Sequence, residues 1–285
     1  MWNEDSRPLA AGLYLVSVPI GTARDITLRA LDTLAKADVL AAEDTRSLRR
    51  LMEIHGVKLG DRRVIAYHDR SGPQIRDRLL AEVTAGKSVA YASEAGTPLV
   101  ADPGFQLVRA ARLADLPVTG APGPSAAIAA LAIAGLPTDR FLFVGFLPNA
   151  EKARQTELEA LAEIPATLVF YESPKRVAAM LRDAAAVLGP AREAAVCREL
   201  TKRFEDVRRA PLGELADAFA GETTKGEIVV LIGRGEAAEA NAADIASALE
   251  AALATMSVRD AADTVATAFG HKRREVYQMA LELSK

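Results

Sequence analysis

Cysteine and histidine are scarce in this chain of 285 residues. The single cysteine, Cys197, excludes an intramolecular disulfide and any zinc site built from several cysteines. The three histidines, at positions 55, 68 and 271, are scattered along the sequence, so a histidine metal site is not expected either. We therefore expect a protein without a bound metal that works in a reducing compartment.

Long apolar runs are also absent. The longest one, 125–136, is rich in alanine and too short to cross a bilayer. The first twelve residues include Glu4, Asp5 and Arg7 and contain no apolar segment of the kind that signal peptides have. The sequence therefore predicts a cytoplasmic protein that does not enter a membrane.

An excess of positive charge is missing as well. With a net charge of −3, the chain has no overall attraction to nucleic acid, so any contact with RNA must come from local basic groups. For each such group the alternative is a set of solvated charges on a helix surface. The groups are Arg46, Arg49 and Arg50; Lys202, Arg203, Arg208 and Arg209; and Lys272, Arg273 and Arg274.

Short runs of Val, Leu and Ile alternate with helical patterns in the first half of the chain. Within 27–37, for example, Leu28, Leu31 and Ala35 recur at helical spacing. Alternation of strands and helices at this pitch predicts a mostly parallel sheet with helices on its faces. The strands are expected at 13–18, 39–42, 64–67, 89–92 and 117–120, and a further helix at 125–134.

Glycine and proline cluster at 135–139, which is the best candidate for a hinge between two lobes. A helix is expected at 174–188, with Ser173 as its cap and Pro174 in its first turn. We assign residues 1–137 to an N-terminal α/β lobe and residues 138–235 to a C-terminal α/β lobe. The strands expected in the second lobe are 141–146, 167–171, 193–198 and 226–232.

The composition changes after Gly233, where alanine and glutamate become frequent. Ser257 and Asp260 form a capping box in front of an apolar stripe that ends at Phe269. A second stripe follows at 276–283. These patterns predict a small helical appendage over residues 241–285, which is either a structural cap or a helix pair that contacts RNA.

Four segments that contain glycine or proline follow predicted strands. In an open α/β sheet the ligand binds beyond the carboxyl ends of the strands, and glycine there lets the backbone approach it. A tight turn is the alternative for any one segment, but four of them at one edge, from both halves of the chain, predict a ligand cleft between two lobes. The segments are 19–22, 93–98, 122–126 and 171–174.

The common phosphate-binding and hydrolase fingerprints are missing. No G-x-G-x-x-G follows the first strand, and no G-x-x-x-x-G-K-[ST] occurs, which disfavours dinucleotide-dependent oxidoreductases and P-loop NTPases. Ser93 and Ser173 lack the G-x-S-x-G setting of a hydrolase nucleophile. These patterns leave the ligand of the cleft unnamed.

Six motifs, which follow one another in order along the chain, indicate the ligand through a family resemblance. They are Val18-Pro19-Ile20-Gly21 with Asp25-Ile26-Thr27; Ala42 to Arg46; Ser93 to Pro98 with Asp102-Pro103-Gly104; Pro122 to Ala126; Phe170 to Arg176; and Arg198 to Lys202 with Lys225-Gly226-Glu227. Together they resemble the tetrapyrrole methylase superfamily, and within it the enzymes that methylate RNA of the small ribosomal subunit. The motifs run from about residue 13 to 233, and the helical tail is similar to that subfamily too. Two positions depart from its usual pattern, with Thr22 in place of Asn and Glu94 in place of Asp.

The resemblance implies an α/β protein with two lobes of the tetrapyrrole methylase type and a C-terminal helical appendage. It implies a homodimer that binds S-adenosylmethionine between its lobes without a metal. The reaction would be 2′-O-methylation of a cytidine ribose in 16S rRNA of the small ribosomal subunit. The cofactor contacts that it implies are Pro19, Gly21, Ser93, Glu94, Ala95, Gly96, Thr97, Ser125, Ala126, Tyr171, Glu172, Lys225 and Gly226.

A 2′-hydroxyl is a poor nucleophile until its proton leaves, so a general base would help. Glu199 and Glu172 are the first candidates, ahead of Glu43 and Asp44, and pairing with a neighbouring arginine is the alternative role for each acid. Basic side chains could hold the phosphates of the RNA as charge-assisted donors. These are Arg46, Arg176, Arg198 and Lys202, with Lys272, Arg273 and Arg274 in the appendage.

Two other functions compete with this one. A small-molecule methyltransferase that acts on a tetrapyrrole precursor would need an enclosed hydrophobic pocket and no basic helical tail. A non-catalytic RNA-binding assembly factor would keep the fold but would not bind S-adenosylmethionine.

Overall fold

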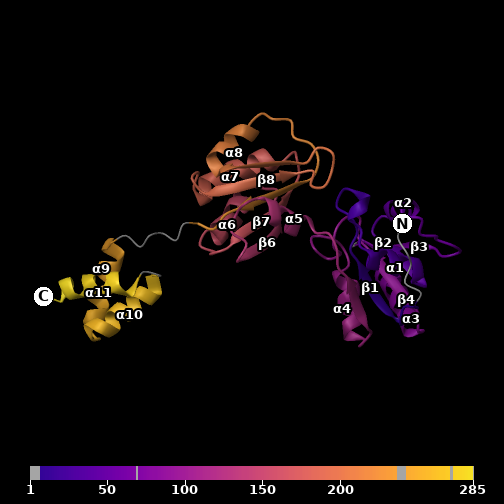
Figure 1. Cartoon of the computed structure of the whole chain (residues 1–285), viewed down its shortest axis with the longest axis horizontal. Helices are drawn as coiled ribbons and strands as arrows, with labels where there is room; N and C mark the ends of the chain where they lie inside the picture. The colour runs from indigo at the N-terminus through magenta and orange to yellow at the C-terminus, as the bar shows by residue number, and fades with distance from the viewer. Residues whose placement is uncertain (1–6, 69, 236–241, 270–271, 285) are drawn as a thin grey trace. The chain divides into compact units, whose positions relative to one another are not determined.

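The computed structural model describes residues 7–68, 70–235, 242–269 and 272–284 (Figure 1). The chain divides into one unit of residues 1–162 and 166–234 and a second unit of residues 163–165 and 235–285. The first unit contains two five-stranded sheets, one in each lobe. The predicted α/β class with a C-terminal helical part is thereby confirmed.

The first sheet is entirely parallel, with the strand order β3-β2-β4-β1-β5. Its strands fall where the apolar runs predict them, because a strand buried on both faces needs apolar side chains throughout. The strands are β1 (Gly12–Val16), β2 (Val39–Ala42), β3 (Val64–Ala66), β4 (Ser88–Ala92) and β5 (Val118–Ala121).

Helices cover both faces of this sheet. On one face, Val16, Leu40 and Ala90 pack with residues of α1 (Leu28–Lys36) and α2 (Thr45–Ile54). On the other face, Leu13 and Tyr91 pack with residues of α3 (Pro73–Thr84) and α4 (Phe105–Leu113). The alternation of side chains along each strand therefore supplies two separate cores from one sheet. A short 3₁₀ helix, η1 (Ala23–Asp25), lies in the loop after β1.

The second sheet is mixed, with the order β6-β7-β10-β8-β9. Only β6 and β7 run parallel; β10 is antiparallel to both β7 and β8, and β9 is antiparallel to β8. The sequence did not predict β9, an edge strand whose alternating half-buried and exposed residues lack an apolar run. The strands are β6 (Phe141–Phe146), β7 (Thr167–Glu172), β8 (Glu193–Arg198), β9 (Asp206–Pro211) and β10 (Ile228–Ile232).

Four helices accompany the second sheet: α5 (Ala126–Ile133), α6 (Glu151–Leu161), α7 (Val177–Leu188) and α8 (Leu212–Phe219). The prediction that a helix begins at Pro174 was wrong by three residues. Pro174 lies in a turn in which the N–H groups of Arg176 and Val177 both donate to the carbonyl of Ser173. The Arg176 side chain bonds the carbonyls of Leu147 and Pro148, which ties this turn to the segment after β6.

Helix α5 precedes the predicted lobe boundary at residue 137, yet it belongs to the core of the second sheet. Its Ala127, Ala130 and Leu131 pack with Val169 and Val229 of that sheet. The chain therefore passes from the first lobe to the second before α5 begins. The boundaries 1–137, 138–235 and 241–285 stay predictions.

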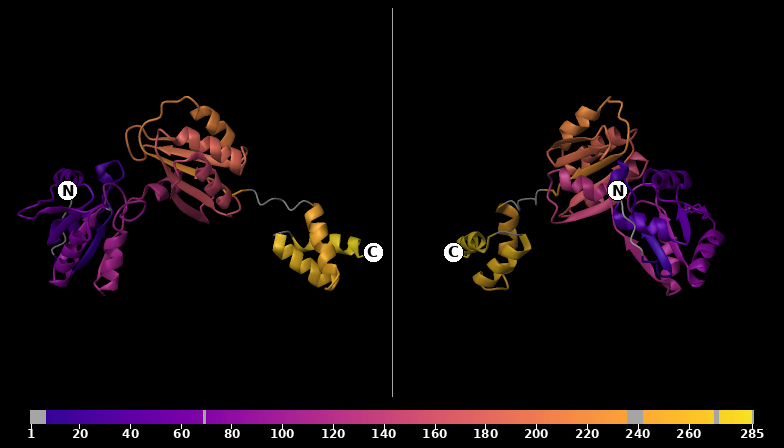
Figure 2. Two further views of the ribbon diagram at one scale, coloured as in Figure 1. Left: turned by 180° about the vertical axis from the view of Figure 1, so that it is seen from behind. Right: turned by 45° about the vertical axis from the view of Figure 1, so that its right-hand side comes forward.

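The C-terminal helices are α9 (Ala242–Leu253), α10 (Val258–Phe269) and α11 (Arg273–Leu283). Each contacts the other two, and they share an apolar core that includes Leu249, Val265 and Val276. The capping box forms as the sequence predicts: Ser257 Oγ accepts from the backbone N–H of Asp260 at 3.2 Å. Figure 2 shows these helices, in yellow, from two further sides.

Candidate active site

The loops that follow β1, β4 and β5 meet at one edge of the first sheet, because parallel strands end at the same edge. Val18 and Gly96 exchange two backbone hydrogen bonds of 2.9 and 3.1 Å, which join the first loop to the second. The Thr97 hydroxyl donates to the carbonyl of Pro124 at 2.9 Å and so joins the second loop to the third. Three of the four predicted segments are thus one connected structure.

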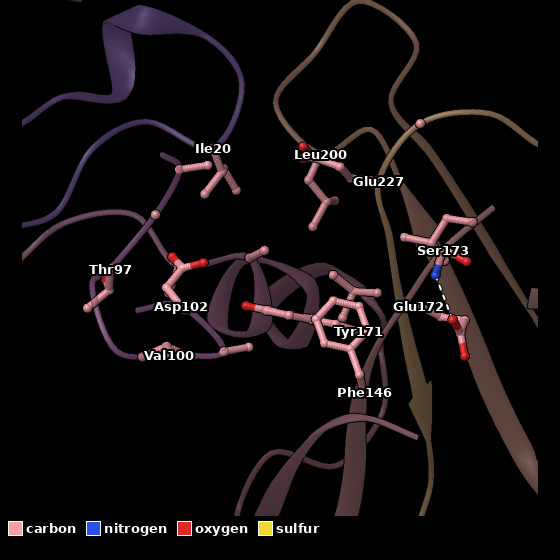
Figure 3. Close-up of a pocket in the computed structure, with 18 of the residues that line it drawn as sticks. Ile20, Thr97, Val100, Asp102, Phe146, Tyr171, Glu172, Ser173, Leu200 and Glu227 are labelled. Atoms are coloured by element: carbon pink, nitrogen blue, oxygen red, sulfur yellow. Dashed lines mark hydrogen bonds between the residues drawn. The ribbon is translucent and has the colours of Figure 1, made fainter. Parts of the chain in front are cut away.

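A cavity of about 410 Å³ opens beside these loops and is closed on its other side by the second lobe (Figure 3). We call it the main cavity. Ile20 of the first lobe and Leu200 of the second face each other across it and belong to one apolar cluster. It is lined by Ile20, Ala95, Gly96, Thr97, Val100, Ala101, Asp102, Ser125, Ala126, Phe146, Tyr171, Glu172, Ser173, Pro174, Leu200, Gly226, Glu227, Ile228 and Val229.

Gly96 lines the main cavity in a backbone conformation that favours glycine. Its φ angle is +71°, and a Cβ atom there would lie 3.3 Å from Ile20 Cγ2 and 3.6 Å from the carbonyl oxygen of Pro124. A side chain would therefore be strained and would point into the crowded loop junction.

Tyr171 joins α5 to the end of β7. Its hydroxyl accepts a hydrogen bond from the backbone N–H of Ala127 at 3.2 Å, and its ring makes edge contacts with Phe143 and Phe146. Burial raises the pKa of the Tyr171 hydroxyl, and the negative charge of Asp102 adds to this shift. The side chain is therefore a neutral, fixed wall of the main cavity.

Glu172, one of the two predicted bases, is only 3% exposed. Its Oε1 accepts from the backbone N–H of Ser173 at 2.7 Å, and its Oε2 lies 3.2 Å from the Arg176 guanidinium. Burial raises the pKa of this carboxyl, against the lowering effects of the Ser173 hydrogen bond and the Arg176 charge. Because Glu172 lines the main cavity, its position is compatible with a role as a base. That role stays a prediction.

Glu199, the other predicted base, does not line the main cavity. Its Oε1 accepts from Lys202 Nζ at 2.9 Å and from the backbone N–H of Glu227 at 3.0 Å. The φ angle of Gly226 is +92°, and a Cβ atom there would lie 2.5 Å from the Glu199 carboxylate. This geometry favours a positioning role, in which Glu199 holds the Gly226–Glu227 turn against the cavity.

The Glu199 carboxylate should also make stability depend on pH. The hydrogen bond from Lys202, followed by that from Glu227 N–H, lowers the pKa of Glu199 below its usual 4.5. This contribution is present above pH 4.5 and is lost as the pH falls through the lower value in the folded state. We expect Glu199→Gln to destabilise the protein by about 1 kcal/mol at pH 7, and the difference from wild type to shrink towards pH 3.

Urea unfolding at several pH values measures this difference. The control is Glu214→Gln, which changes an exposed carboxylate of α8. A Glu199→Gln deficit that stays constant down to pH 3 would contradict the ion-pair explanation.

The predicted cofactor contacts separate into two groups and one residue outside both. Eight line the main cavity: Ala95, Gly96, Thr97, Ser125, Ala126, Tyr171, Glu172 and Gly226. Pro19, Gly21, Ser93 and Glu94 line two neighbouring cavities instead, and Lys225 lines none of the three.

The two departures from the family pattern lie in this neighbouring region. The backbone N–H of Thr22 donates to Thr201 Oγ1 at 3.2 Å, and that of Glu94 donates to the Glu43 carboxylate at 3.2 Å. Both contacts use the main chain, so neither requires a particular side chain at position 22 or 94.

Two of the predicted phosphate-binding residues are engaged inside the protein. Arg176 bonds Asn149 Oδ1 and the carbonyls of Leu147 and Pro148, and Lys202 bonds Glu199 and Glu227. Arg46 lies 3.2 Å from the Asp44 carboxylate, but its side chain is 89% exposed beside a groove of about 560 Å³ that Arg50 also lines. Arg198 is half-buried, 4.0 Å from the Asp206 carboxylate.

The three residues of the appendage that were predicted to bind RNA lie at the start of α11. Lys272, Arg273 and Arg274 are all exposed. Lys272 Nζ lies 3.7 Å from Glu275, and Arg273 pairs with Asp263 of α10. They are placed for contact with a solvent-side partner, and their role with RNA stays a prediction.

Several residues that line the main cavity were not among the predicted contacts. Ile20, Asp102, Ser173 and Glu227 stand inside the motifs that carry the resemblance, so the sequence contained a signal for them. Phe146 and other strand residues had none, because an apolar side chain in a strand looks like core whether or not a cavity adjoins it.

No helix in the described part of the chain is long and apolar enough to cross a membrane. Among the same residues, no group of three or more His, Cys, Asp or Glu side chains is arranged to hold a metal ion.

Comparison with known families gives two matches that lie one after the other. The family of tetrapyrrole (corrin/porphyrin) methylases matches residues 12–216. The RsmI C-terminal HTH domain matches residues 239–284, which contain α9, α10 and α11.

Two curated relatives are similar over nearly their whole length. A ribosomal RNA small subunit methyltransferase I of Mesorhizobium japonicum is 48% identical over 98% of this chain and 94% of its own. The protein of the same name from Escherichia coli O157:H7 is 43% identical over 95% of this chain and 94% of its own.

Solved structures with the same fold are more distant in sequence. Diphthine synthase aligns with a TM-score of 0.60 at 17% identity, covering 78% of this chain and 89% of its own. A uroporphyrin-III C-methyltransferase from Thermus thermophilus, solved with S-adenyl homocysteine, aligns with a TM-score of 0.53 at 23% identity, covering 77% of this chain and 96% of its own.

Proposed function

Because the chain belongs to the tetrapyrrole methylase family, and within it to the ribosomal RNA small subunit methyltransferase I group, we propose that it transfers a methyl group from S-adenosylmethionine to RNA of the small ribosomal subunit. The acceptor is the 2′-hydroxyl of a cytidine ribose in 16S rRNA. The observation that carries this proposal is similarity over nearly the full chain, helical unit included.

The helical unit separates this function from its first rival. A tetrapyrrole methyltransferase needs only the two α/β lobes, whereas this chain adds a helix-turn-helix match with three exposed basic residues at the start of α11. Three exposed cations next to one another suit a large anionic substrate. The second rival, a non-catalytic assembly factor, predicts that S-adenosylmethionine does not bind.

The main cavity fits S-adenosylmethionine in size and in charge. Its volume of about 410 Å³ lies within the range of small-molecule sites. Its described lining includes Asp102, Glu172 and Glu227 but no lysine or arginine, which suits a ligand with a sulfonium and an ammonium group. Glu172 Oε2 is buried 3.2 Å from the Arg176 guanidinium but forms no hydrogen bond with the described residues, so a donor group of the ligand would add one.

When bound, S-adenosylmethionine supplies a methyl group on a positively charged sulfur atom. Ile20, Leu200 and Phe146 would exclude water from the main cavity and give the adenine an apolar surface. Tyr171 and the joined loops around Gly96 are already held in place by hydrogen bonds, so little order is lost on binding.

The RNA would approach from the side of the neighbouring groove, where Arg46 and Arg50 can bind phosphates. The nucleotide that carries the target ribose must leave its stack to reach a cavity of this size, so an unpaired segment is the expected substrate.

We further propose that the protein acts in the cytoplasm and forms a homodimer. Size-exclusion chromatography with light scattering would test the homodimer.

Methylation of isolated small subunits tests the function directly. We expect the purified protein and S-adenosylmethionine to form 2′-O-methylcytidine in 16S rRNA of subunits from a strain without the enzyme, at least ~100-fold faster than on free cytidine. Nuclease digestion and mass spectrometry identify the product. Equal rates on free cytidine, or methylation of a tetrapyrrole precursor alone, would overturn the proposal.

A further inference from the structure

A second cavity adjoins the main cavity. It measures about 440 Å³, and we call it the polar cleft because charged side chains of both lobes line it, among them Glu43, Glu94 and Lys202. The two cavities share Ile20, Ala95, Asp102 and Glu227 in their linings. If the methyl donor occupies the main cavity and the ribose enters through the polar cleft, the reacting atoms must meet where these shared residues lie.

Two of the shared residues can accept a proton, Asp102 and Glu227. The Glu227 side chain is 70% exposed, so water surrounds most of it. Asp102 is half-buried and lies on the first-lobe side of the main cavity, across from Leu200 and Tyr171 (Figure 3).

The loop that carries Asp102 is fixed at both ends. Before it, the Thr97 hydroxyl lies 3.1 Å from Ser17 Oγ and donates to the carbonyl of Pro124. After it, the carbonyl of Pro103 accepts from the buried hydroxyl of Tyr91 at 3.1 Å. Such anchoring is typical of a catalytic side chain that must stay in place when the substrate arrives.

The same loop contains backbone strain. Leu99 and Ala101 have φ angles of +74° and +59°; the other non-glycine residues of the described chain with a positive φ are Asp115, Glu199 and Thr201. Conformations of this kind are unfavourable and concentrate at functional sites. Two of them within three residues, directly before Asp102, indicate that the direction of this carboxylate is maintained against a cost in stability.

We infer that Asp102 is a catalytic residue, the general base that accepts the proton of the ribose 2′-hydroxyl. This inference rests on the proposed function. As the proton passes to the Asp102 carboxylate, the ribose oxygen forms its bond to the methyl carbon, the carbon–sulfur bond breaks, and its electron pair stays on sulfur. The products are the 2′-O-methyl ribose and S-adenosylhomocysteine, and the protonated Asp102 then releases its proton to water.

Asp102→Asn tests this role, because it keeps the shape of the side chain and removes the basic oxygen. We expect kcat on small subunits to fall by ~10²–10³-fold, while the Kd for S-adenosylhomocysteine, measured by calorimetry, changes by less than about threefold. The acidic limb of the wild-type pH–kcat profile should disappear in the variant. Asp102→Glu, which restores the carboxylate on a longer side chain, should recover part of the activity.

Glu227→Gln is the comparison variant, since Glu227 lines the same two cavities, and Asp61→Asn, at an exposed carboxylate outside both, is the control. The inference is overturned if Asp102→Asn keeps kcat within threefold, if its acidic limb persists, or if its affinity for S-adenosylhomocysteine falls as much as its activity. A larger loss of kcat in Glu227→Gln would assign the base to Glu227 instead. An inactive wild-type protein would reject the proposed function itself.

Discussion

Gly96→Val should abolish binding of the methyl donor while the protein stays folded. At this φ angle of +71° a β-branched side chain is strongly disfavoured, and its Cβ would lie 3.3 Å from Ile20 Cγ2 in the wall of the main cavity. The backbone hydrogen bonds between Gly96 and Val18 would have to shift, and the loop would move into the cavity. We expect the affinity for S-adenosylhomocysteine, measured by calorimetry, to fall by at least ~100-fold, about 2.7 kcal/mol.

Gly86→Val is the matched control. Gly86 also has a positive φ, +86°, but a Cβ atom there meets nothing within 4 Å. Its replacement therefore introduces the same kind of backbone strain outside the site. Both variants should lose stability, and only Gly96→Val should lose affinity. Unchanged affinity in Gly96→Val would remove this loop from the donor site.

Asp183→Ala should cause the largest loss of stability. Asp183 Oδ2 accepts from Arg154 Nε at 2.7 Å, and the two side chains are only 2% and 5% exposed. Removal of the carboxylate would leave the Arg154 charge buried without its counter-ion, which typically costs about 3–5 kcal/mol. For a unit of this size we expect the melting temperature to fall by ~6–20 °C in differential scanning calorimetry.

Loss of the Arg154–Asp183 ion pair should also disturb the wall of the main cavity. Arg154 Nη1 also bonds the carbonyls of Pro148 and Asn149, two and three residues after Phe146, which lines the cavity. Asp217→Ala, at an exposed acid of α8, is the control and should change the melting temperature little. The double variant Arg154→Met/Asp183→Leu should be more stable than Asp183→Ala, since it leaves no buried charge. A fall of less than 2 °C in the melting temperature of Asp183→Ala would show that the burial of Arg154 does not depend on Asp183.

The roles that we assign to the three carboxylates of this region follow from their surroundings rather than from residue type. Glu199 binds Lys202 outside the main cavity, which favours a positioning role. Glu172 binds Ser173 N–H and Arg176 but lines the main cavity, so its role as a base stays a prediction. Asp102 lies where two cavities meet, on a loop that is anchored at both ends. Motif position alone does not distinguish these three carboxylates, because all of them stand in segments that carry the family resemblance.

The strands of the first sheet could be predicted because burial on both faces requires uninterrupted apolar runs. The mixed second sheet was less predictable. β9 is half-exposed and charged, so its pairing with β8 depends on a neighbour rather than on its own sequence. The start of α7 was missed for a similar reason, since contacts of Arg176 with the segment after β6 accompany the turn at Pro174.

The amino-acid sequence by itself determined the α/β class, the ordered glycine- and proline-containing segments at strand ends, and the family to which they belong. These depend on local periodicity and on turn residues, which act over a few positions. Only the tertiary structure decided that α5 packs on the second sheet, that Glu199 binds Lys202 outside the main cavity, and that Asp102 lies between two cavities. The reason is physical: a side chain's partners come from residues distant in the sequence, and their distances exist only once both lobes have folded.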